Sequence, residues 1–215
     1  MPNTIIEALM QSFRRADHGA EPYPHWYPQD LFPGSVARDV CELPFAPPVI
    51  GDTEGRRETH NAVRQFFDRE TREKYTVCDQ IASAYASPEV VGCIEERFEC
   101  SLKGTYLRIE HCLDTGGFWL APHTDLGVKR FTLLHYLSDH PQAETWGTDV
   151  YRDADHWAER VPARFNSALV FVPSDRTWHG FERRNIAGVR RSLIVNYVSS
   201  EWRNRHELAS DVAVA

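Results

Sequence analysis

The sequence predicts an α+β fold, mainly β, because its two halves differ in texture. Up to residue 104, apolar residues recur at helical spacing between proline-rich connectors. From Thr105 onward they form short alternating or continuous apolar runs bounded by turn residues, as strands do. We therefore expect one domain over residues 1–215, with residues 1–104 as a helical support region packed outside a two-sheet β core formed by residues 105–200.

The first half is expected to contain five helices. Apolar residues recur at helical spacing over Thr4–Arg15, and the prolines of Glu21–Pro28 end this helix and leave an extended connector over the core. Ser87 and Pro88 favour a helix N-cap and first turn, so a helix is expected to begin there. The remaining predicted helices cover Ser35–Glu42, Asn61–Phe67 and Val77–Tyr85.

The second half is expected to form a sandwich or barrel of short strands. Its apolar runs are separated by turn residues at the spacing typical of such folds. The predicted strands cover Thr105–Leu113, Trp119–Thr124, Arg130–Leu137, Thr148–Tyr151, Ala168–Val172, Thr177–Phe181 and Ser192–Val198.

The composition argues against several classes of function. The net charge is −7 and there is no run of Lys or Arg, whereas nucleic-acid binding depends on clustered cations, so we expect no nucleic-acid partner. No apolar stretch approaches the roughly 18–20 residues that span a bilayer, so we expect no membrane partner and a cytoplasmic protein. The five cysteines form no CxxC, which predicts free thiols rather than disulfides or a zinc ribbon. Nothing in the sequence indicates the oligomeric state.

Two short motifs could supply metal ligands. Pro122-His123-Thr124-Asp125 places an imidazole and a carboxylate two residues apart, and in a strand this spacing turns both side chains to one face. His179 follows an apolar run and a turn, and an antiparallel sheet would bring it back opposite the first pair. Two histidines and one carboxylate leave one face of a metal open for a bidentate co-substrate and dioxygen, which suits iron(II). The alternative is an exposed turn in which Asp125 is a local cap.

A cationic strand near the C-terminus adds to this pattern. Arg190 lies eleven residues after His179, and Ser192 lies on the same face of the predicted strand. An arginine fork beside a hydroxyl suits the distal carboxylate of a five-carbon diacid, because it can form charge-assisted bidentate hydrogen bonds. Arg191 competes for this role, but alternation through Ile194 favours Arg190 as the inward residue.

The order of HxD, Trp-His-Gly-Phe and Arg-x-Ser resembles that of the 2-oxoglutarate/Fe(II)-dependent oxygenase superfamily. The stretch from Leu107 to Tyr197 is similar to the prolyl-4-hydroxylase-like branch and to small bacterial 2OG-Fe(II) oxygenases. The resemblance implies a double-stranded β-helix, or jelly-roll, core with the N-terminal helices packed on one sheet. It also implies Fe(II) as cofactor and 2-oxoglutarate as co-substrate.

The resemblance assigns roles to individual residues. It implies His123 and Asp125 as proximal metal ligands and His179 as the distal ligand, and these three residues are the expected catalytic centre. The residues that it implies for 2-oxoglutarate are Arg190, Ser192 and Tyr136.

The strand before the HxD motif departs from the family pattern. Where the family often has a further tyrosine, this sequence has His111 and Cys112. His111 could replace that tyrosine or could simply pack. His135 should point away from its neighbour Tyr136, and we interpret it as structural.

Three residues are candidates for substrate contacts. Arg108 lies on a polar strand face that is either exposed to solvent or lines the substrate entrance. Trp119 precedes the HxD motif and could wall the cavity, although such aromatic residues more often belong to the core. Asn196 continues the inward alternation of the last strand.

The resemblance therefore implies a dioxygenase, most often a hydroxylase, with dioxygen as the second substrate and with release of succinate and CO2. The small size of the chain and the lack of an obvious peptide-docking extension favour a small molecule as the substrate. Asp125 argues against a halogenase, because a small residue replaces the carboxylate in that variant of the family. Desaturation and ring formation stay open. The alternatives are a jelly-roll isomerase or lyase that uses zinc, manganese or nickel, a sensor with vestigial metal binding, and a hydroxylase of protein side chains.

Overall fold

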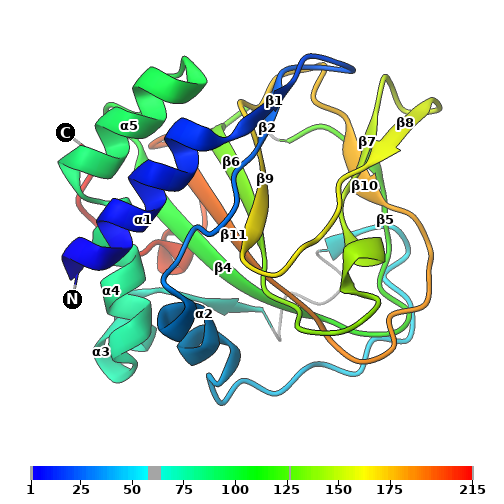
Figure 1. The fold of residues 1–215 in the computed structure, drawn as a ribbon, viewed down its shortest axis with the longest axis horizontal. Helices are drawn as coiled ribbons and strands as arrows, with labels where there is room; N and C mark the ends of the chain where they lie inside the picture. Colours follow the sequence, from blue (N-terminus) through cyan, green and yellow to red (C-terminus); the bar gives the residue numbers. More distant parts are fainter. Residues whose placement is uncertain (1, 58–63, 126, 215) are drawn as a thin grey trace.

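Two antiparallel sheets face each other across the interior of the protein, and helices cover the outer face of the larger sheet (Figure 1). The computed structural model describes residues 2–57, 64–125 and 127–214. Its strands are β1 (Asp17–Gly19), β2 (His25–Tyr27), β3 (Gln65–Phe66), β4 (Tyr106–Asp114), β5 (Leu120–His123), β6 (Lys129–Tyr136), β7 (Asp149–Tyr151), β8 (Trp157–Arg160), β9 (Ser167–Phe171), β10 (His179–Phe181) and β11 (Arg190–Val198). Its helices are α1 (Pro2–Arg15), α2 (Gly34–Cys41), α3 (Arg69–Lys74), α4 (Thr76–Tyr85) and α5 (Pro88–Phe98), with short 3-10 helices η2 (Ala143–Trp146) and η3 (Arg205–Glu207). The mainly β prediction, with helices on one sheet, is confirmed.

β11 lies in the interior of the larger sheet and organises it. The strand order of that sheet is β1-β2-β9-β6-β11-β4-β3, and the order of the smaller sheet is β5-β10-β7-β8. Ser192 of β11 lies opposite Cys112 of β4 on one side and Tyr136 of β6 on the other. Because side chains alternate along paired strands, the sheet presents one set of residues to the helices and another to the smaller sheet.

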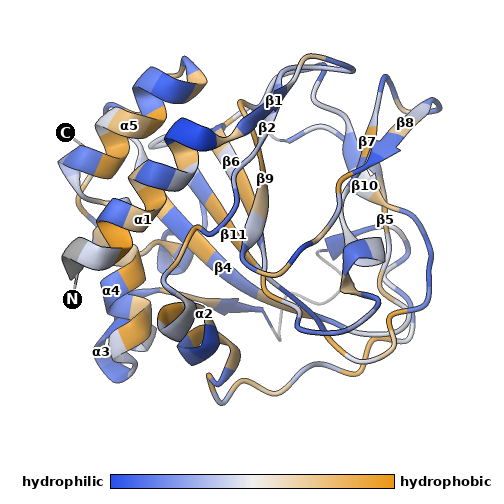
Figure 2. Cartoon of the chain, in the orientation of Figure 1, coloured by the Kyte–Doolittle hydropathy of each residue, from blue (hydrophilic) through white to orange (hydrophobic). Residues whose placement is uncertain are grey.

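The helix-facing side of the larger sheet is apolar. Ile109, Leu133 and Val195 are buried in one cluster with Leu9 of α1 and Ile81 of α4. Figure 2 shows apolar and polar residues alternating around α1 and α5, as amphipathic helices on a core require. The opposite face of the same strands carries these buried polar residues: Arg108, Glu110, Thr132, Arg190, Ser192 and Asn196. Buried polar side chains must be satisfied, so this second face is where a functional site is expected.

The predicted strands are all present, with boundaries shifted by at most two residues. The first, second, fourth and fifth predicted helices correspond to α1, α2, α4 and α5. Ser87 caps α5 as expected, because its hydroxyl accepts a hydrogen bond from the backbone N–H of Val90.

The predicted helix Asn61–Phe67 is wrong in its described part. Gln65–Phe66 forms the edge strand β3, which pairs with His111 and Glu110 of β4. Residues 61–63 lie outside the described part of the chain. The open edge of β4 offers backbone partners to a short segment with little helical pattern of its own, so tertiary pairing outweighs local preference.

Several further elements have no counterpart among the predictions. The helix α3 is capped by Asp68, whose carboxylate accepts from the Thr71 N–H over 2.8 Å. β1 and β2 form a hairpin that extends the larger sheet through the pairing of Trp26 with Val170. β8 pairs with β7 at the edge of the smaller sheet. The extended connector Glu21–Pro28 thus becomes partly a strand.

The structure also bears on the expectations about the cysteines and about membrane-spanning segments. The five cysteines are all free thiols. Within the described ranges, no helix is both long enough and apolar enough to cross a membrane.

Candidate functional site

The residues of the two histidine motifs meet where β5 and β10 pair. His179, the first residue of β10, lies opposite His123, the last residue of β5, and their ring centroids are 4.4 Å apart. The ligand atoms of His123, Asp125 and His179 all lie within 4.8 Å of one another. Asp125 lies two residues beyond the end of β5, so it reaches the site from the irregular segment after the strand and not by strand alternation. The structure thus brings the three predicted ligands together, although Asp125 is placed by the segment after β5 and not by the strand itself.

Gly180 allows the two strands to approach closely beside this cluster. A Cβ atom at Gly180 would lie 2.9 Å from the carbonyl oxygen of Leu120 and 3.2 Å from that of Ala121, both on β5. Any side chain would push β5 and β10 apart, so the glycine in Trp-His-Gly fixes the distance between the imidazoles.

Both imidazoles are held in the same tautomer by backbone carbonyl groups two residues earlier. His123 Nδ1 lies 2.9 Å from the Ala121 oxygen, and His179 Nδ1 lies 2.9 Å from the Thr177 oxygen. A carbonyl oxygen can only accept, so each Nδ1 carries the hydrogen and each Nε2 keeps its lone pair for a metal. The pKa of His179 is lowered to about 4 by burial and by His123, which keeps its ring neutral near pH 7.

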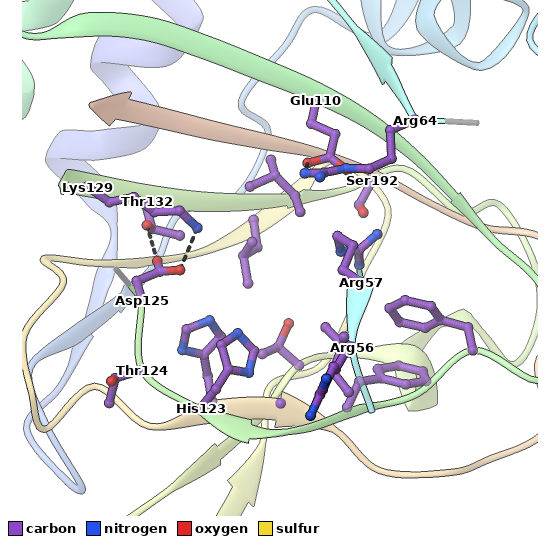
Figure 3. Close-up of a pocket in the computed structure, with 18 of the residues that line it drawn as sticks. Arg56, Arg57, Arg64, Glu110, His123, Thr124, Asp125, Lys129, Thr132 and Ser192 are labelled. Atoms are coloured by element: carbon purple, nitrogen blue, oxygen red, sulfur yellow. Dashed lines mark hydrogen bonds and ion pairs between the residues drawn. The ribbon is translucent and has the colours of Figure 1, made fainter. Parts of the chain in front are cut away.

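Asp125 is ionised and held by two side chains. Lys129 donates a hydrogen bond of 2.5 Å to Oδ1, and Thr132 donates one of 2.7 Å to Oδ2 (Figure 3). Burial alone would raise the pKa of Asp125, but the charges of Lys129 and His179 and these hydrogen bonds hold that pKa well below its usual range. No sequence motif points to Lys129, whereas Thr132 shares the inward alternation of Tyr136 on the same strand.

A polar network continues from Thr132 to the C-terminal segment. Asn196 Nδ2 donates to Thr132 Oγ1 over 2.9 Å, and Arg108 Nη1 lies 3.3 Å from Asn196 Oδ1. Arg108 also forms ion pairs with Glu207, at 2.6 Å, and with Glu110, at 2.9 Å.

This network changes the interpretation of two predicted substrate contacts. Asn196 is fully buried and is not part of the cavity wall, so it supports the site from behind. Arg108 lines the cavity, but its guanidinium is occupied by the residues that hold it.

A cavity of about 350 Å³ lies between the two sheets and contains the cluster. Figure 3 shows His123 and Asp125 at one end, and Ser192 with the Arg64–Glu110 pair at the other. Apolar side chains lie between these ends or flank them: Phe118, Leu120, Leu134, Phe181 and Ile194. The cavity wall therefore combines a potential metal site, a cationic end and an apolar surface that keeps water out.

Arg190 is the arginine of the last strand that enters the cavity. Arg190 is 6% exposed. Its Nε donates a hydrogen bond of 2.7 Å to the backbone oxygen of Trp146, and its Nη1 donates one of 2.6 Å to Asp114. Ser192 lines the same cavity and Arg191 does not. The phase deduced from alternation therefore agrees with the orientation of these side chains.

Tyr136 and Trp119 lie outside the cavity wall, contrary to expectation. The Tyr136 hydroxyl donates to Thr148 Oγ1 over 2.8 Å, and Thr148 is the residue that lines the cavity. The Trp119 indole donates to Asp52 over 2.6 Å, and Arg183 stacks on its ring at 4.4 Å, so this ring is fixed toward the surface. Among the described residues, the Thr148 hydroxyl hydrogen has no acceptor, which leaves it able to donate into the cavity.

His111 packs away from the cavity. It alternates with Ile109 on the helix-facing side of β4, beside the rings of Phe45 and Phe67. Burial lowers the pKa of His111 to about 3. It is a core residue, and it does not take the place of a co-substrate tyrosine. His135 is likewise structural, because its Nε2 bonds to Asn166 at 3.0 Å in the core.

The donor set fits Fe(II). Two imidazole nitrogens and one carboxylate are the ligands of non-haem iron oxygenases, and they leave coordination positions open. The same cavity provides Arg190, Ser192 and Thr148 for a carboxylate at some distance from the ligands. A diacid that chelates a metal at one end and needs a cation at the other matches this arrangement.

Comparisons with known proteins agree with this geometry. Residues 107–198 match the family model of the 2OG-Fe(II) oxygenase superfamily. No curated protein matches the sequence. The matched residues run from β4 to β11 and include all three members of the histidine and aspartate cluster.

Solved structures share the fold at low sequence identity. A prolyl 4-hydroxylase of Phytophthora capsici has a TM-score of 0.62 and 12% identity, over 94% of this chain and 66% of that one, so this chain spans just under two thirds of its length. A prolyl-4-hydroxylase of Pseudomonas putida has a TM-score of 0.58 and 15% identity, over 90% of this chain and 98% of that one. HygX of Streptomyces hygroscopicus, solved with iron bound, has a TM-score of 0.52 and 14% identity, over 82% of this chain and 83% of that one.

The solved structures show that the fold is shared, and the family match concerns the strand-rich part of the chain. Residues 107–198 therefore match the 2OG-Fe(II) oxygenase superfamily, and they contain a His-Asp-His cluster that could hold a metal ion.

Proposed function

We propose that this protein is an Fe(II)- and 2-oxoglutarate-dependent dioxygenase that hydroxylates a small molecule, with His123, Asp125 and His179 as its metal ligands. The observation that carries the ligand assignment is the approach of two imidazole nitrogens and a carboxylate oxygen to within 4.8 Å of one another in a cavity. Fe(II) bound there would supply the oxidation of a substrate C–H bond, coupled to conversion of 2-oxoglutarate to succinate and CO2.

We assign Arg190 and Ser192 to the distal carboxylate of 2-oxoglutarate. Their shared position on the inward face of β11 supports this role, as does the anchoring of Arg190 by Trp146. Thr148 is the third donor in place of Tyr136, whose hydroxyl acts through Thr148. A guanidinium and two hydroxyl groups suit one carboxylate.

The chain's own groups have distinct tasks in the reaction. The carbonyl oxygens of Ala121 and Thr177 fix the imidazole tautomers, while Lys129 and Thr132 orient Asp125. The apolar part of the wall excludes water and directs the substrate toward the ligands.

The size of the cavity supports a small-molecule substrate. About 350 Å³ is within the range of roughly 300–1,000 Å³ of small-molecule sites, and 2-oxoglutarate takes part of it. The fold shared with prolyl hydroxylases makes a peptide the alternative, and a substrate screen should therefore include both metabolites and proline-containing peptides.

The ligand assignment is tested by His123→Ala and Asp125→Ala, with His156→Ala as the matched control because His156 is exposed at the surface. We expect the first two variants to lose stoichiometric Fe(II) binding and succinate release, because two remaining ligands hold iron poorly. The control should keep both. Wild-type turnover in either ligand variant would refute the assignment.

A further inference from the structure

Asp114 joins two arginines that come from different parts of the chain. Its Oδ2 accepts a hydrogen bond of 2.6 Å from Arg190 Nη1, and its Oδ1 accepts one of 3.0 Å from Arg57 Nη1. Arg57 Nη2 is 3.4 Å from Oδ2. Arg190 begins the last strand, whereas Arg57 belongs to the segment before the jelly-roll. One carboxylate thus sets the relative position of two guanidinium groups.

This cluster is buried and carries excess positive charge. The exposed fractions of the side chains are 4% for Asp114, 7% for Arg190 and 17% for Arg57. Two cations and one anion leave a net charge of +1, and the nearby carboxylate of Glu110 is already bonded to Arg64 and Arg108. A buried charge that lacks compensation is costly, so an additional anion would stabilise the cluster.

Both guanidinium groups face the cavity. Arg57, Arg190 and Ser192 all line it, and Figure 3 shows Arg57 and Ser192 pointing into the same part of it. The Phe118 ring lies 4.6 Å from the Arg57 guanidinium carbon and 5.9 Å from that of Arg190. This ring therefore shields one side of both guanidinium groups from water.

We propose that Arg57 is a second guanidinium ligand for the distal carboxylate of 2-oxoglutarate, positioned beside Arg190 by Asp114. The proposal rests on the proposed function, in which Arg190 binds that carboxylate. Two forks on one carboxylate favour a dicarboxylate over a 2-oxo acid with a neutral tail, so Arg57 determines co-substrate specificity.

The test measures binding of two co-substrates to the Mn(II)-loaded protein by calorimetry, without turnover. The probes are 2-oxoglutarate and 2-oxopentanoate, which has a methyl group where the distal carboxylate would be. The variants are Arg57→Gln, Arg57→Lys and Arg190→Gln. Arg183→Gln is the control, because it removes a cation that is 58% exposed and pairs with Asp52 at the surface.

We expect Arg57→Gln to weaken 2-oxoglutarate roughly tenfold or more and to leave 2-oxopentanoate within about twofold of wild type. Arg57→Lys should recover part of the loss, because it keeps the charge without the fork. Arg183→Gln should change neither affinity. If Arg57→Gln misfolds, as a thermal unfolding curve would reveal, the discrimination between the two acids by Arg57→Lys provides the same test.

Two results would overturn the proposal. Equal weakening of both acids would mean that Arg57 only supports the structure of the site. Unchanged 2-oxoglutarate affinity in Arg57→Gln, together with a large loss in Arg190→Gln, would leave the proposed function intact and remove Arg57 from it. If Arg190→Gln also had no effect, the proposed co-substrate site itself would fail.

Discussion

Thr132 Oγ1 donates a hydrogen bond to Asp125 Oδ2 over 2.7 Å, and this bond ties the candidate carboxylate ligand to the larger sheet. Asp125 lies in the irregular segment after β5, so strand geometry alone does not orient it. Asn196 holds Thr132 in turn, from the neighbouring strand β11. The position of the carboxylate thus depends on a rigid part of the molecule outside its own sheet.

Replacing Thr132 by valine should weaken metal binding without unfolding the protein. Valine keeps the shape of threonine and removes only the donor, and loss of such a supporting group costs roughly 10–100-fold in metal affinity. Anaerobic competition titration with a chelating dye measures the change. Thr145→Val, at an exposed position on η2, is the control and should bind metal as wild type does. Unchanged affinity in Thr132→Val would show that Asp125 is oriented by other contacts.

Lys129 compensates Asp125 in the metal-free protein, so Lys129→Met should destabilise that form in particular. The pair is largely buried, with exposed fractions of 18% for Lys129 and 4% for Asp125. Removing one partner of such a pair costs about 3 kcal/mol, and a bound dication would take over the missing charge. Mn(II) should therefore raise the melting temperature of the variant more than that of wild type, as measured by differential scanning fluorimetry. The exposed Lys103→Met serves as the control, and an equal Mn(II) effect in both variants would contradict the prediction.

The core of the fold could be predicted because its strands carry their own signals. Alternation in Arg190–Val198 fixes both the strand and its phase, and the pairing of His179 with His123 follows from an antiparallel return. The helix error at Asn61–Phe67 has the opposite cause. Gln65 and Phe66 join an existing edge, and only the tertiary structure reveals that edge.

Only the site residues that belong to short sequence motifs could be predicted from the sequence. HxD and Arg-x-Ser identify residues whose spacing is local. Lys129 has no such signal, and Arg57 lies in an irregular segment whose relation to Arg190 depends on a shared contact with Asp114. Tyr136 was expected in the cavity because the family pattern was transferred residue by residue, while Thr148 occupies the intervening position here.

Arg190→Ala should weaken 2-oxoglutarate far more than Arg191→Ala does. Arg190 is buried against the cavity, whereas Arg191 projects toward the helix-facing side, near His111 and Cys41. Loss of a buried charge-assisted contact costs about 2–5 kcal/mol, so we expect at least roughly a thirtyfold loss for Arg190 and a few-fold change for Arg191. Calorimetric titration of 2-oxoglutarate measures both. A reversed ranking would mean that the strand presents the other face to the co-substrate.

His111→Phe should make the stability of the protein less sensitive to acid. The pKa of His111 is lowered from 6.5 to about 3 in the folded state, chiefly by burial, and among the described residues neither ring nitrogen has a hydrogen-bond partner. Below pH 6.5 the unfolded chain takes up a proton that the folded protein rejects, so this contribution to stability is present above pH 6.5 and is lost progressively as the pH falls toward 3. At about pH 5 the loss from this one residue is about 2 kcal/mol. Urea unfolding at about pH 7.5 and about pH 5 measures it, and the difference between the two free energies should shrink by that amount in His111→Phe. The exposed His206→Gln is the control and should keep the wild-type difference, since its side chain lies at the surface. An unchanged difference in His111→Phe would mean that the ring is protonated or hydrated within the folded protein.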